Sequence, residues 1–514
     1  MRLRNTGTQL ARKIAGELET NRGAWLVLFS LFYLGAAMLR SSRPLWYDEL
    51  LTYNIVKLPS LPAVWNMLLK GGDLNPPLLY VATRAATSVF GSSEAALRLP
   101  GIVGFLVMCC CLYLFAARRA GPCYGFTAML LPMATGAFVY ASEARAYGMV
   151  LGFCGLAMVC WQRAVDSPHR APFLAGMSAA LTAALLTHCY AVLVLAPFGT
   201  AQIVRDWRRR KIDWLHWAFL VLPLSACVTY LPLLAASQPY AVDNPIFRPT
   251  WHSPVKFYDF LLTPALGPLF LGALLVAFTA ASKEEKAEPE SEQRWRPDDI
   301  ALGVGFLLVP VLAMLLAVFL THIFMLRYGL TAVIGVSILF THVSAVLAGK
   351  SRQVGALLAG LIVAWLVGSG VDRLVEGLAA PPEPAISFQQ HPELPLVVSS
   401  GLIFYEMNHY AKPEVAARMA YLTDEQTARR RTGADVFDKG LPALNRLFPL
   451  RARLEDYHSF VAAHSRFLLY GYAAYETDWL VPQLLQDGAQ LTYLGQRTEQ
   501  WGRATLYDVH IPKR

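Results

Sequence analysis

Long apolar runs divide the first 370 or so residues of this chain at regular intervals. Each run approaches the roughly 20 residues that an α-helix needs to cross a bilayer. Only 16% of the residues are charged, against about 25% in soluble domains. We therefore predict a polytopic α-helical membrane protein with about eleven spans, and up to thirteen if closely spaced runs divide further. The expected spans are 24–40, 98–116, 122–140, 147–162, 172–188, 189–204, 216–236, 257–280, 300–320, 329–348 and 354–371.

Lysine and arginine gather in alternate loops, which fixes the expected orientation. Basic residues cluster at the N-terminus and again at Arg118–Arg119, at 205–211 and at Lys350 with Arg352. Because cytoplasmic loops carry the excess of such residues, the N-terminus is expected in the cytoplasm. The formal net charge of +9 is then a topology signal, and we expect no nucleic-acid partner. A bacterial inner-membrane location fits this pattern.

The composition changes to that of a soluble domain at about residue 373. Strand-like segments at 395–400, 466–470 and 491–494, with a helix at 480–486, predict a small α/β domain. Eleven spans place this domain, residues 373–514, outside the cytoplasm. Residues 1–372 form the expected membrane domain.

Two connecting segments and the cysteines complete this outline. The long first outer loop, 41–97, has apolar residues at helical spacing between Leu61 and Leu69, which predicts short helices lying in the membrane interface. The charged segment 282–299 reads as a cytoplasmic linker. All eight cysteines fall in or beside spans, where they act as small apolar residues.

The polar motifs collect on the outward side of this topology. Ionisable residues are costly near the membrane and usually persist there for function. The motifs lie in four outward loops, although the topology rests on basic residues in the opposite loops. Their shared side indicates one site. The candidate residues are Asp48, Glu49, Asp73, Asn75, Glu143, Arg145, Tyr147, His188, Arg327 and Tyr328.

Six of these motifs, taken in order, resemble the GT-C membrane glycosyltransferases. They are Asp-Glu after the first span, Asp-x-x-Pro-Pro-Leu-x-Tyr, Gly-x-x-Glu-x-x-x-Arg-Leu-Pro, Ser-Glu-Ala-Arg-x-Tyr, Thr-His-x-Tyr and Arg-Tyr. The pattern is closest to bacterial relatives of protein O-mannosyltransferases and aminoarabinose transferases. It covers roughly residues 24–350. The chain has Asn75 where many relatives have a histidine before the proline pair.

The resemblance implies transfer of a sugar from a polyprenyl phosphate donor to a lipid, glycan or protein acceptor outside the membrane. Displacement at the anomeric carbon needs a base for the acceptor proton and a cation for the departing phosphate. Asp48 resembles the family's base, whereas Glu49 more naturally orients a loop or a second ligand. Arg327 is the candidate phosphate ligand, because a guanidinium keeps its charge and presents several donors.

Several alternatives stay open at this level. For Arg327 and for Arg145, an anchor at the level of the lipid headgroups fits the sequence as well as a phosphate ligand does. Glu143 fits a structural partner of an arginine somewhat better than a catalytic group, and it would share a helix face with Tyr147 if the intervening turn were helical. Arg98 reads as a structural residue paired with Glu94.

His188 reads first as a packing residue. A divalent metal would need carboxylates beside it, so the cofactor is unknown. The alternative function is a transporter or flippase for a lipid-linked saccharide, which favours inverted repeats and interrupted helices at mid-membrane.

Overall fold

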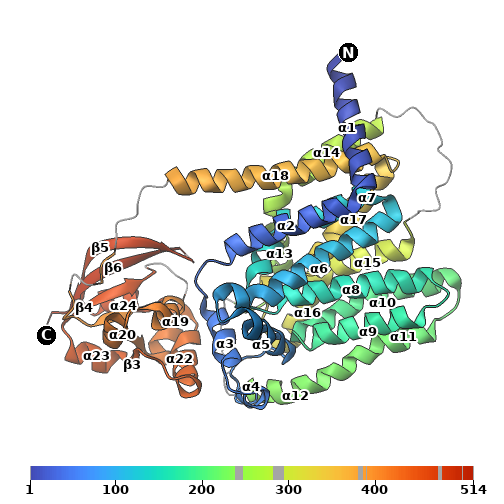
Figure 1. Ribbon diagram of the computed structural model, residues 1–514. Helices are drawn as coiled ribbons and strands as arrows, with labels where there is room; N and C mark the ends of the chain where they lie inside the picture. The colour runs from blue at the N-terminus through green and yellow to red at the C-terminus, as the bar shows by residue number, and fades with distance from the viewer. Residues whose placement is uncertain are drawn as a thin grey trace. The chain divides into compact units, whose positions relative to one another are not determined.

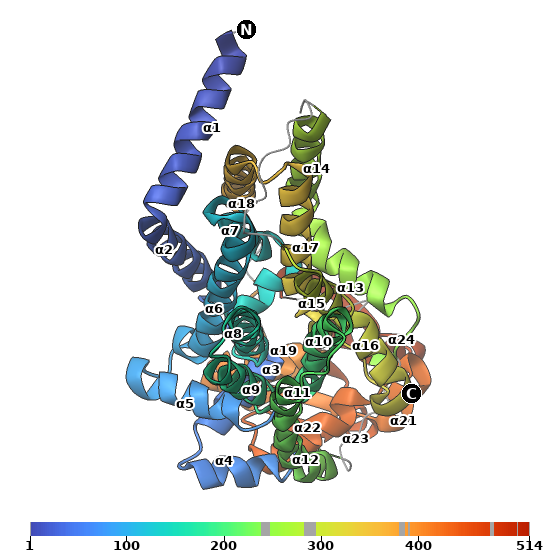
Figure 2. The same ribbon diagram turned by 90° about the vertical axis from the view of Figure 1, so that its right-hand side faces the viewer.

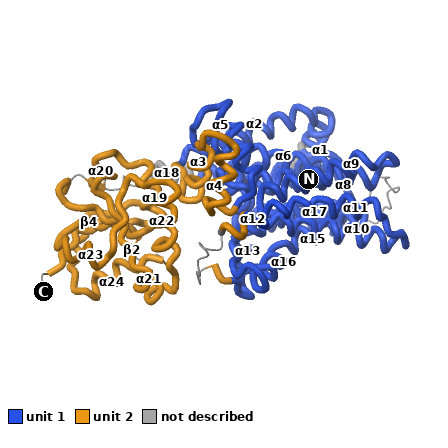
Figure 3. Tube along the Cα trace, turned by 90° about the horizontal axis from the view of Figure 1, so that it is seen from below, with its two compact units in different colours: residues 1–43, 75–232, 249–376 blue, residues 44–74, 233–248, 377–514 orange. Residues whose placement is uncertain are grey.

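The computed structural model divides into two compact units, each built from separate parts of the chain. It describes residues 2–237, 247–281, 295–379, 386–388, 391–472, 477–500 and 502–512. Unit 1 comprises 1–43, 75–232 and 249–376, and unit 2 comprises 44–74, 233–248 and 377–514 (Figure 3). The chain thus enters unit 2 for the last time close to the domain boundary expected at residue 372. The segment 44–74, from the expected first outer loop, belongs to the same unit as the C-terminal part.

Unit 1 is helical, and each of the eleven expected spans coincides with a helical segment (Figures 1 and 2). Two of the helices continue into unit 2, namely α12 and α18. The helices are α1 (Arg2–Thr20), α2 (Arg22–Arg40), α5 (Leu78–Phe90), α6 (Glu94–Ala120), α7 (Pro122–Leu130), η1 (Leu131–Ala134), η2 (Gly136–Ser142), α8 (Tyr147–Asp166), α9 (Ala171–Leu185), η3 (Cys189–Val194), α10 (Leu195–Arg209), α11 (Trp214–Val221), η4 (Leu222–Thr229), α12 (Tyr230–Ser237), α13 (Ser253–Leu262), η7 (Thr263–Ala265), α14 (Leu266–Ala281), α15 (Pro297–Leu307), α16 (Val309–Leu316), η8 (Ala317–Thr321), η9 (Leu326–Gly329), α17 (Ala332–Leu347) and α18 (Arg352–Ala379).

Fewer of these segments meet the length and hydropathy of a complete span than the eleven expected. Within the described residues, six helices are long and apolar enough, and two bent pairs raise this number to eight. The bends are 77° between Pro122–Ala134 and Gly136–Ser142, and 44° between Pro297–Leu307 and Val309–Thr321. Ala171–Leu185 and Ala332–Leu347 are apolar but shorter. The charged linker expected at 282–299 lies mostly outside the described residues.

Helices α6 and α8 lie side by side in unit 1 (Figures 1 and 2), and glycines on both let their backbones approach closely. A Cβ placed on Gly148 would lie 2.2 Å from the carbonyl oxygen of Gly101, and one on Gly152 would lie 2.5 Å from that of Gly104. Small residues at such crossings are typical of membrane helices, whose association depends on packing. Tyr147 directly precedes the first of these contacts, so the crossing sets the position of this candidate residue.

Ion pairs join the C-terminal ends of α6 and α8 to the start of α15 in unit 1. Arg119, at the end of α6, contacts Asp299 of α15 at 2.7 Å and Asp166 of α8 at 3.1 Å. Arg296 adds a contact to Asp166 at 2.8 Å. The loops that contribute these groups are among those expected to face the cytoplasm. Removing one partner of a buried pair leaves an uncompensated charge, which is strongly destabilising, so the network fastens these helix ends together.

Unit 2 contains a six-stranded sheet with the order β3-β2-β1-β4-β6-β5. The first four are parallel neighbours, whereas β6 pairs antiparallel with β4 and β5. The predicted α/β fold is confirmed, with β1, β4, β5 and α24 where the sequence places three strands and a helix. The elements are α3 (Tyr47–Val56), α4 (Leu61–Leu68), β1 (Leu396–Val398), α19 (Gly401–Tyr410), α20 (Pro413–Arg418), β2 (Met419–Thr423), α21 (Glu425–Thr432), α22 (Val436–Leu447), β3 (Arg453–Asp456), α23 (Tyr457–Ala463), β4 (Arg466–Gly471), α24 (Leu480–Gln486), β5 (Gln490–Glu499) and β6 (Gly502–His510).

Helices cover the sheet of unit 2 and enclose its core. Phe460 of α23 and Leu484 of α24 pack with Phe467 of β4 in one buried cluster. Phe404 of α19 contacts Tyr421 of β2, with ring centroids 5.4 Å apart. Since successive side chains of a strand point to opposite faces, Tyr421 and its buried neighbour Leu422 serve the two different faces. The sheet therefore has helices on both sides.

The glycine crossing yields the first prediction. Gly148→Val should prevent stable assembly of unit 1, because the added side chain meets the backbone of α6, which cannot move aside cheaply. The readout is the yield of monodisperse protein in detergent and its thermal midpoint. Gly360→Val is the matched control, since a Cβ on this α18 glycine meets nothing within 4 Å. Equal loss in both variants, or none in Gly148→Val, would contradict the proposed crossing.

Candidate active site

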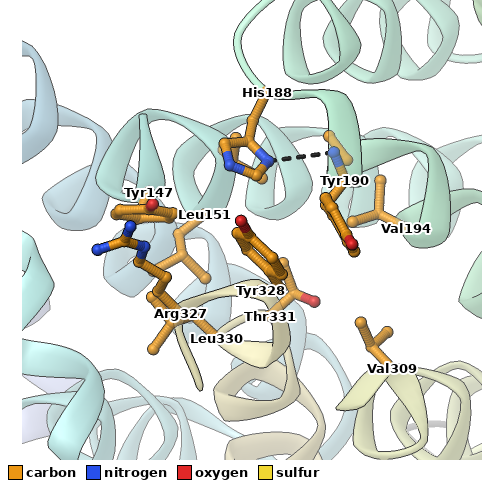
Figure 4. A pocket seen from close by; sticks show the side chains of 12 residues that line it. Tyr147, Leu151, His188, Tyr190, Val194, Val309, Arg327, Tyr328, Leu330 and Thr331 are labelled. Carbon is orange, nitrogen blue, oxygen red and sulfur yellow. Dashed lines mark hydrogen bonds between the residues drawn. The ribbon is translucent and has the colours of Figure 1, made fainter. Parts of the chain in front are cut away.

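Four of the candidate residues line one small cavity in unit 1 (Figure 4). Tyr147 stands at the start of α8, His188 immediately before η3, and Arg327 with Tyr328 in η9. The cavity has a volume of about 20 Å³, which is room for about one water molecule. The sequence thus identified residues from three separate loops that the fold brings together. A phosphate group would enter only if these side chains moved apart.

Aromatic rings form most of the wall around His188. Its ring centroid lies 5.5 Å from that of Tyr147 and 5.6 Å from that of Tyr328. Nδ1 of His188 accepts a hydrogen bond from the backbone N–H of Tyr190 at 3.1 Å (Figure 4). A neutral imidazole that accepts at Nδ1 carries its proton on Nε2. His188 is therefore oriented by the backbone, as expected for a packing residue.

Arg327 brings a positive charge to this aromatic wall. Its guanidinium carbon lies 5.9 Å from the ring centroid of Tyr147, within the range of a cation–π contact. Figure 4 shows the guanidinium beside the face of Tyr147. The next residue, Tyr328, stacks on Tyr190 with centroids 4.0 Å apart. Tyr190 belongs to the Thr-His-x-Tyr motif but was not among the predicted site residues, because spacing alone gave it no chemical role.

An irregular backbone precedes η9 and sets the position of Arg327. The segment η8 is a π-helix that ends at His322, whose φ of 55° is left-handed. Such conformations cost free energy in residues other than glycine and persist where the surrounding structure holds them. The hydroxyl of Tyr190 donates to the carbonyl oxygen of Ile323 at 2.9 Å. Tyr190 therefore ties this irregular segment to the same wall.

Glu143 and Arg145 lie next to the cavity in sequence but not among the residues that line it. Glu143 pairs with Arg43, with Oε1 and Nη2 3.6 Å apart. This contact agrees with a structural partner of an arginine. The expectation that Glu143 shares a helix face with Tyr147 is wrong, since the chain from 143 to 146 is a bend and α8 begins only at Tyr147.

Arg98 has the structural role expected, with backbone partners that the sequence could not reveal. It is fully buried, and Nη1 donates to the carbonyl oxygens of Ser41 and Arg43, each at 2.7 Å. These carbonyls follow the C-terminus of α2, where backbone acceptors lack helical partners. Arg98 therefore fixes the last residues of unit 1 before the chain enters unit 2.

The Asp-x-x-Pro-Pro motif is divided between the two units. Asp73 is in unit 2, where Oδ1 accepts from the backbone N–H of Leu74 at 2.7 Å. Asn75 is buried in unit 1. The proline pair launches α5, as predicted, and Leu78 donates its N–H to the carbonyl oxygen of Leu186 at 3.0 Å. This bond places the start of α5 beside the hairpin that carries His188.

Asp48 and Glu49 occupy the first turn of α3 in unit 2. Buried Glu49 accepts a hydrogen bond from the backbone N–H of Trp46 at 3.3 Å, so it caps the helix that presents Asp48. This contact suits a loop-orienting residue. The helix N-terminus also stabilises negative charge on Asp48.

Helix α3 is fixed to the C-terminal part of unit 2 through α19. The ring of Tyr47 lies 5.0 Å from that of Tyr405 and 5.7 Å from that of Phe437. Asn54 donates to the hydroxyl of Tyr405 at 2.7 Å. Long-range contacts from residues after 400 therefore hold Asp48 in place, which no local motif predicts.

The described residues contain no group of three or more His, Cys, Asp and Glu side chains that could hold a metal ion. The eight cysteines are free thiols within helical segments, as expected.

Comparison with known proteins agrees with the resemblance seen in the sequence. The family model of dolichyl-phosphate-mannose-protein mannosyltransferases matches residues 74–233, about a third of the chain. No curated protein matches the chain. The fold is similar to that of ArnT from Cupriavidus metallidurans bound to undecaprenyl phosphate, with 14% identity, a TM-score of 0.51 and coverage of 94% of this chain and 98% of that one.

Two further solved structures are similar at lower scores. They are the apo state of the same ArnT, with 15% identity, a TM-score of 0.42 and coverage of 95% and 98%, and the Archaeoglobus fulgidus oligosaccharyltransferase with Zn and sulfate, with 12% identity, a TM-score of 0.42 and coverage of 86% and 67%.

The chain thus has a fold similar to that of ArnT, a solved GT-C glycosyltransferase, with six to eight candidate membrane spans among the described residues. The predicted fold class is confirmed, and the family match supports the suspected relationship over residues 74–233. The segment matched by the family model contains Tyr147 and His188, two of the residues that line the cavity.

The anchoring of α3 yields the second prediction. Tyr405→Phe removes the hydrogen bond with Asn54 and should cost about 1 kcal/mol of unfolding free energy. Tyr405→Ala also removes the ring packed against Tyr47 and should cost about 3 kcal/mol or more. Denaturant unfolding of the purified protein measures both values. Tyr493→Ala is the control, because this β5 tyrosine is exposed. Equal stability in Tyr405→Ala and the control would show that α3 is not anchored at this point.

Proposed function

We propose that this protein transfers a sugar from a polyprenyl phosphate donor to an acceptor hydroxyl or amine on the outer face of the membrane. The observation that carries the proposal is the cavity that combines Arg327, His188 and three tyrosines at the meeting point of three loops. The donor class follows from the similarity in fold to a structure bound to undecaprenyl phosphate and from the chemistry of these side chains. The side chains of the cavity do not distinguish a lipid, a glycan or a protein as the acceptor.

The cavity offers the donors that a lipid phosphate requires. The Arg327 guanidinium can form two parallel hydrogen bonds with phosphate oxygens, and its charge compensates the phosphate in a poorly hydrated place. Nε2 of His188 and the hydroxyls of Tyr147 and Tyr328 are groups that can donate to a phosphate. Charge that develops on the phosphate as the sugar leaves is stabilised by these fixed groups.

The transfer itself is a direct displacement. An acceptor oxygen or nitrogen forms a bond to the anomeric carbon while the bond from that carbon to the phosphate oxygen breaks, and the phosphate keeps the bonding electrons. Asp48 takes the proton of the acceptor as the general base.

A transporter for a lipid-linked saccharide is the second candidate, and one observation favours it. Two helix pairs of unit 1 bend by 77° and 44°, and interrupted helices are common in transporters. Proteoliposomes with a labelled polyprenyl-phosphate sugar separate the two functions. A transferase forms a new glycosidic bond with an added acceptor, whereas a transporter only moves the intact donor between leaflets.

The third prediction tests Arg327. Arg327→Ala should weaken binding of a polyprenyl phosphate roughly 10- to 100-fold, the usual value of a hydrogen bond to a charged group. Arg327→Lys should fall between it and the wild type, because the charge stays while the two-pronged geometry is lost. Titration of undecaprenyl phosphate measures the affinities. Arg163→Lys on exposed α8 surface is the control. If Arg327→Lys binds like the wild type, Arg327 is an interfacial anchor, and equal affinity of Arg327→Ala would make Arg145 the next candidate.

The fourth prediction tests Asp48. Asp48→Asn should lower the transfer rate by ~10²–10⁴, as expected for loss of a general base, and leave affinity for the lipid phosphate nearly unchanged. Glu49→Gln should do less harm, because an amide oxygen can still accept from the N–H of Trp46. Single-turnover transfer with purified variants gives both rates. The opposite ranking would exchange the roles of the two carboxylates, and wild-type turnover of Asp48→Asn would exclude it as the base.

A further inference from the structure

Unit 2 contains a second, larger cavity that the transfer reaction does not use. Its volume is about 470 Å³, within the range of roughly 300–1,000 Å³ that small-molecule sites occupy. The walls come from the segment 386–388, the end of α19, the start of α20 and the end of β5, with Pro44 from the chain before α3. All of these parts belong to unit 2.

A buried carboxyl group stands in this cavity. Oε1 of Glu406 is shielded from solvent and has no hydrogen-bond partner among the described residues. Burial, reinforced by Glu499 and Glu49, raises the pKa of Glu406 to about 8. At neutral pH the group therefore carries a proton, so it can donate one hydrogen bond and accept another. A buried polar atom without a partner is costly, and a rotation of the Glu406 side chain that turns Oε1 toward the cavity would let a ligand hydroxyl supply the missing contact.

The other charged side chains of the cavity nearly balance. Glu499 lines it and is held by the hydroxyl of Tyr470, which donates at 2.6 Å, and by Arg497 at 3.7 Å. Lys412 supplies a second cation. Two cations beside one ionised carboxylate leave a small net positive charge, which disfavours a metal ion or an organic cation. Donors and acceptors are both present, as a ligand rich in hydroxyl groups requires.

Aromatic side chains provide apolar surface in the same cavity. Phe388 packs edge-on against Tyr470, with centroids 5.1 Å apart, and Arg418 donates to its backbone carbonyl oxygen. Tyr410 is fixed through its hydroxyl, which accepts from the backbone N–H of Leu45 at 2.9 Å. Rings held in this way suit the apolar face of a pyranose, whose edge carries the hydroxyl groups. Tyr470 and Tyr472 are buried and offer no such surface.

We propose that this cavity of unit 2, with Glu406 at its wall, is a binding site for a neutral saccharide. The ligand packs a sugar face against Phe388 or Tyr410 and exchanges hydrogen bonds between its hydroxyl groups and Glu406. The proposal does not depend on the transfer reaction, because it concerns binding in unit 2 alone and involves neither Asp48 nor Arg327.

The test measures saccharide binding to the full-length protein in a detergent without a sugar headgroup, since a maltoside would compete for the site. Cellobiose and maltose are titrated as neutral disaccharides, and 1,4-diaminobutane serves as the cationic probe. Saturation-transfer NMR detects binding, and thermal melting confirms that each variant is folded. We expect at least one disaccharide to bind saturably and the diamine not to compete with it.

The variants separate the contributions of the cavity. Glu406→Leu and Phe388→Ala should each weaken disaccharide binding about tenfold or more, because each removes one kind of contact. Glu406→Gln should stay within about threefold, since an amide also donates and accepts. Glu414→Gln on α20 makes the same change on exposed surface and should have no effect.

Other results would overturn the proposal. It fails if neither disaccharide binds, if the diamine takes their place, or if Glu406→Leu and Phe388→Ala both bind as the wild type does. If Glu406→Leu does not fold, Phe388→Ala alone decides the outcome. Loss of transfer with intact disaccharide binding, as expected of Asp48→Asn, keeps the two proposals distinct.

Discussion

The contact between the backbones of α6 and α8 determines much of what unit 1 can present. In a membrane, apolar side chains gain little by leaving lipid for protein, so helix association depends on close packing. Gly101 and Gly104 on one helix and Gly148 and Gly152 on the other permit an approach that any side chain would block. The start of α8 is fixed by this approach. Tyr147 then has a defined place opposite η9, and the ion pairs around Arg119 secure the far ends of the same helices.

The candidate site combines the fixed start of α8 with the irregular backbone that follows η8. The ring of Tyr328 stacks on Tyr190, and Tyr190 holds the backbone that follows the π-helix η8. π-Helical turns are often found at functional sites. Because the cavity holds about one water molecule, occupation by a phosphate requires rearrangement of its wall. The irregular segment 322–325 lies outside the lining of the cavity but leads directly into η9, which carries Arg327.

The sequence predicts the parts of this fold that depend on local pattern. Apolar runs located a helical segment at each of the eleven expected spans but not α1 or α5. The outward motifs located Tyr147, His188, Arg327 and Tyr328 before any of them could be placed in space. Length and hydropathy overcounted complete spans, because several helices are short or bent at prolines and 3₁₀ turns. The pattern also missed β2, β3 and β6, and it could not reveal that Arg98 binds two backbone carbonyls or that Tyr405 anchors α3. These contacts join residues 55 to 351 positions apart, which no local spacing records.

The grouping of residues 44–74 with the C-terminal part has a consequence for how such proteins can diversify by recombination. Helix α3, which carries Asp48, takes its ring contacts and its hydrogen bond from Tyr405 and Phe437. A chimera that exchanged only residues 377–514 would keep Asp48 and replace the surface that holds its helix. The two segments therefore have to be inherited together, although residues 75–376, most of them in unit 1, separate them in the chain. A recombinant protein that keeps α3 in place therefore needs residues 44–74 and 377–514 from the same parent protein.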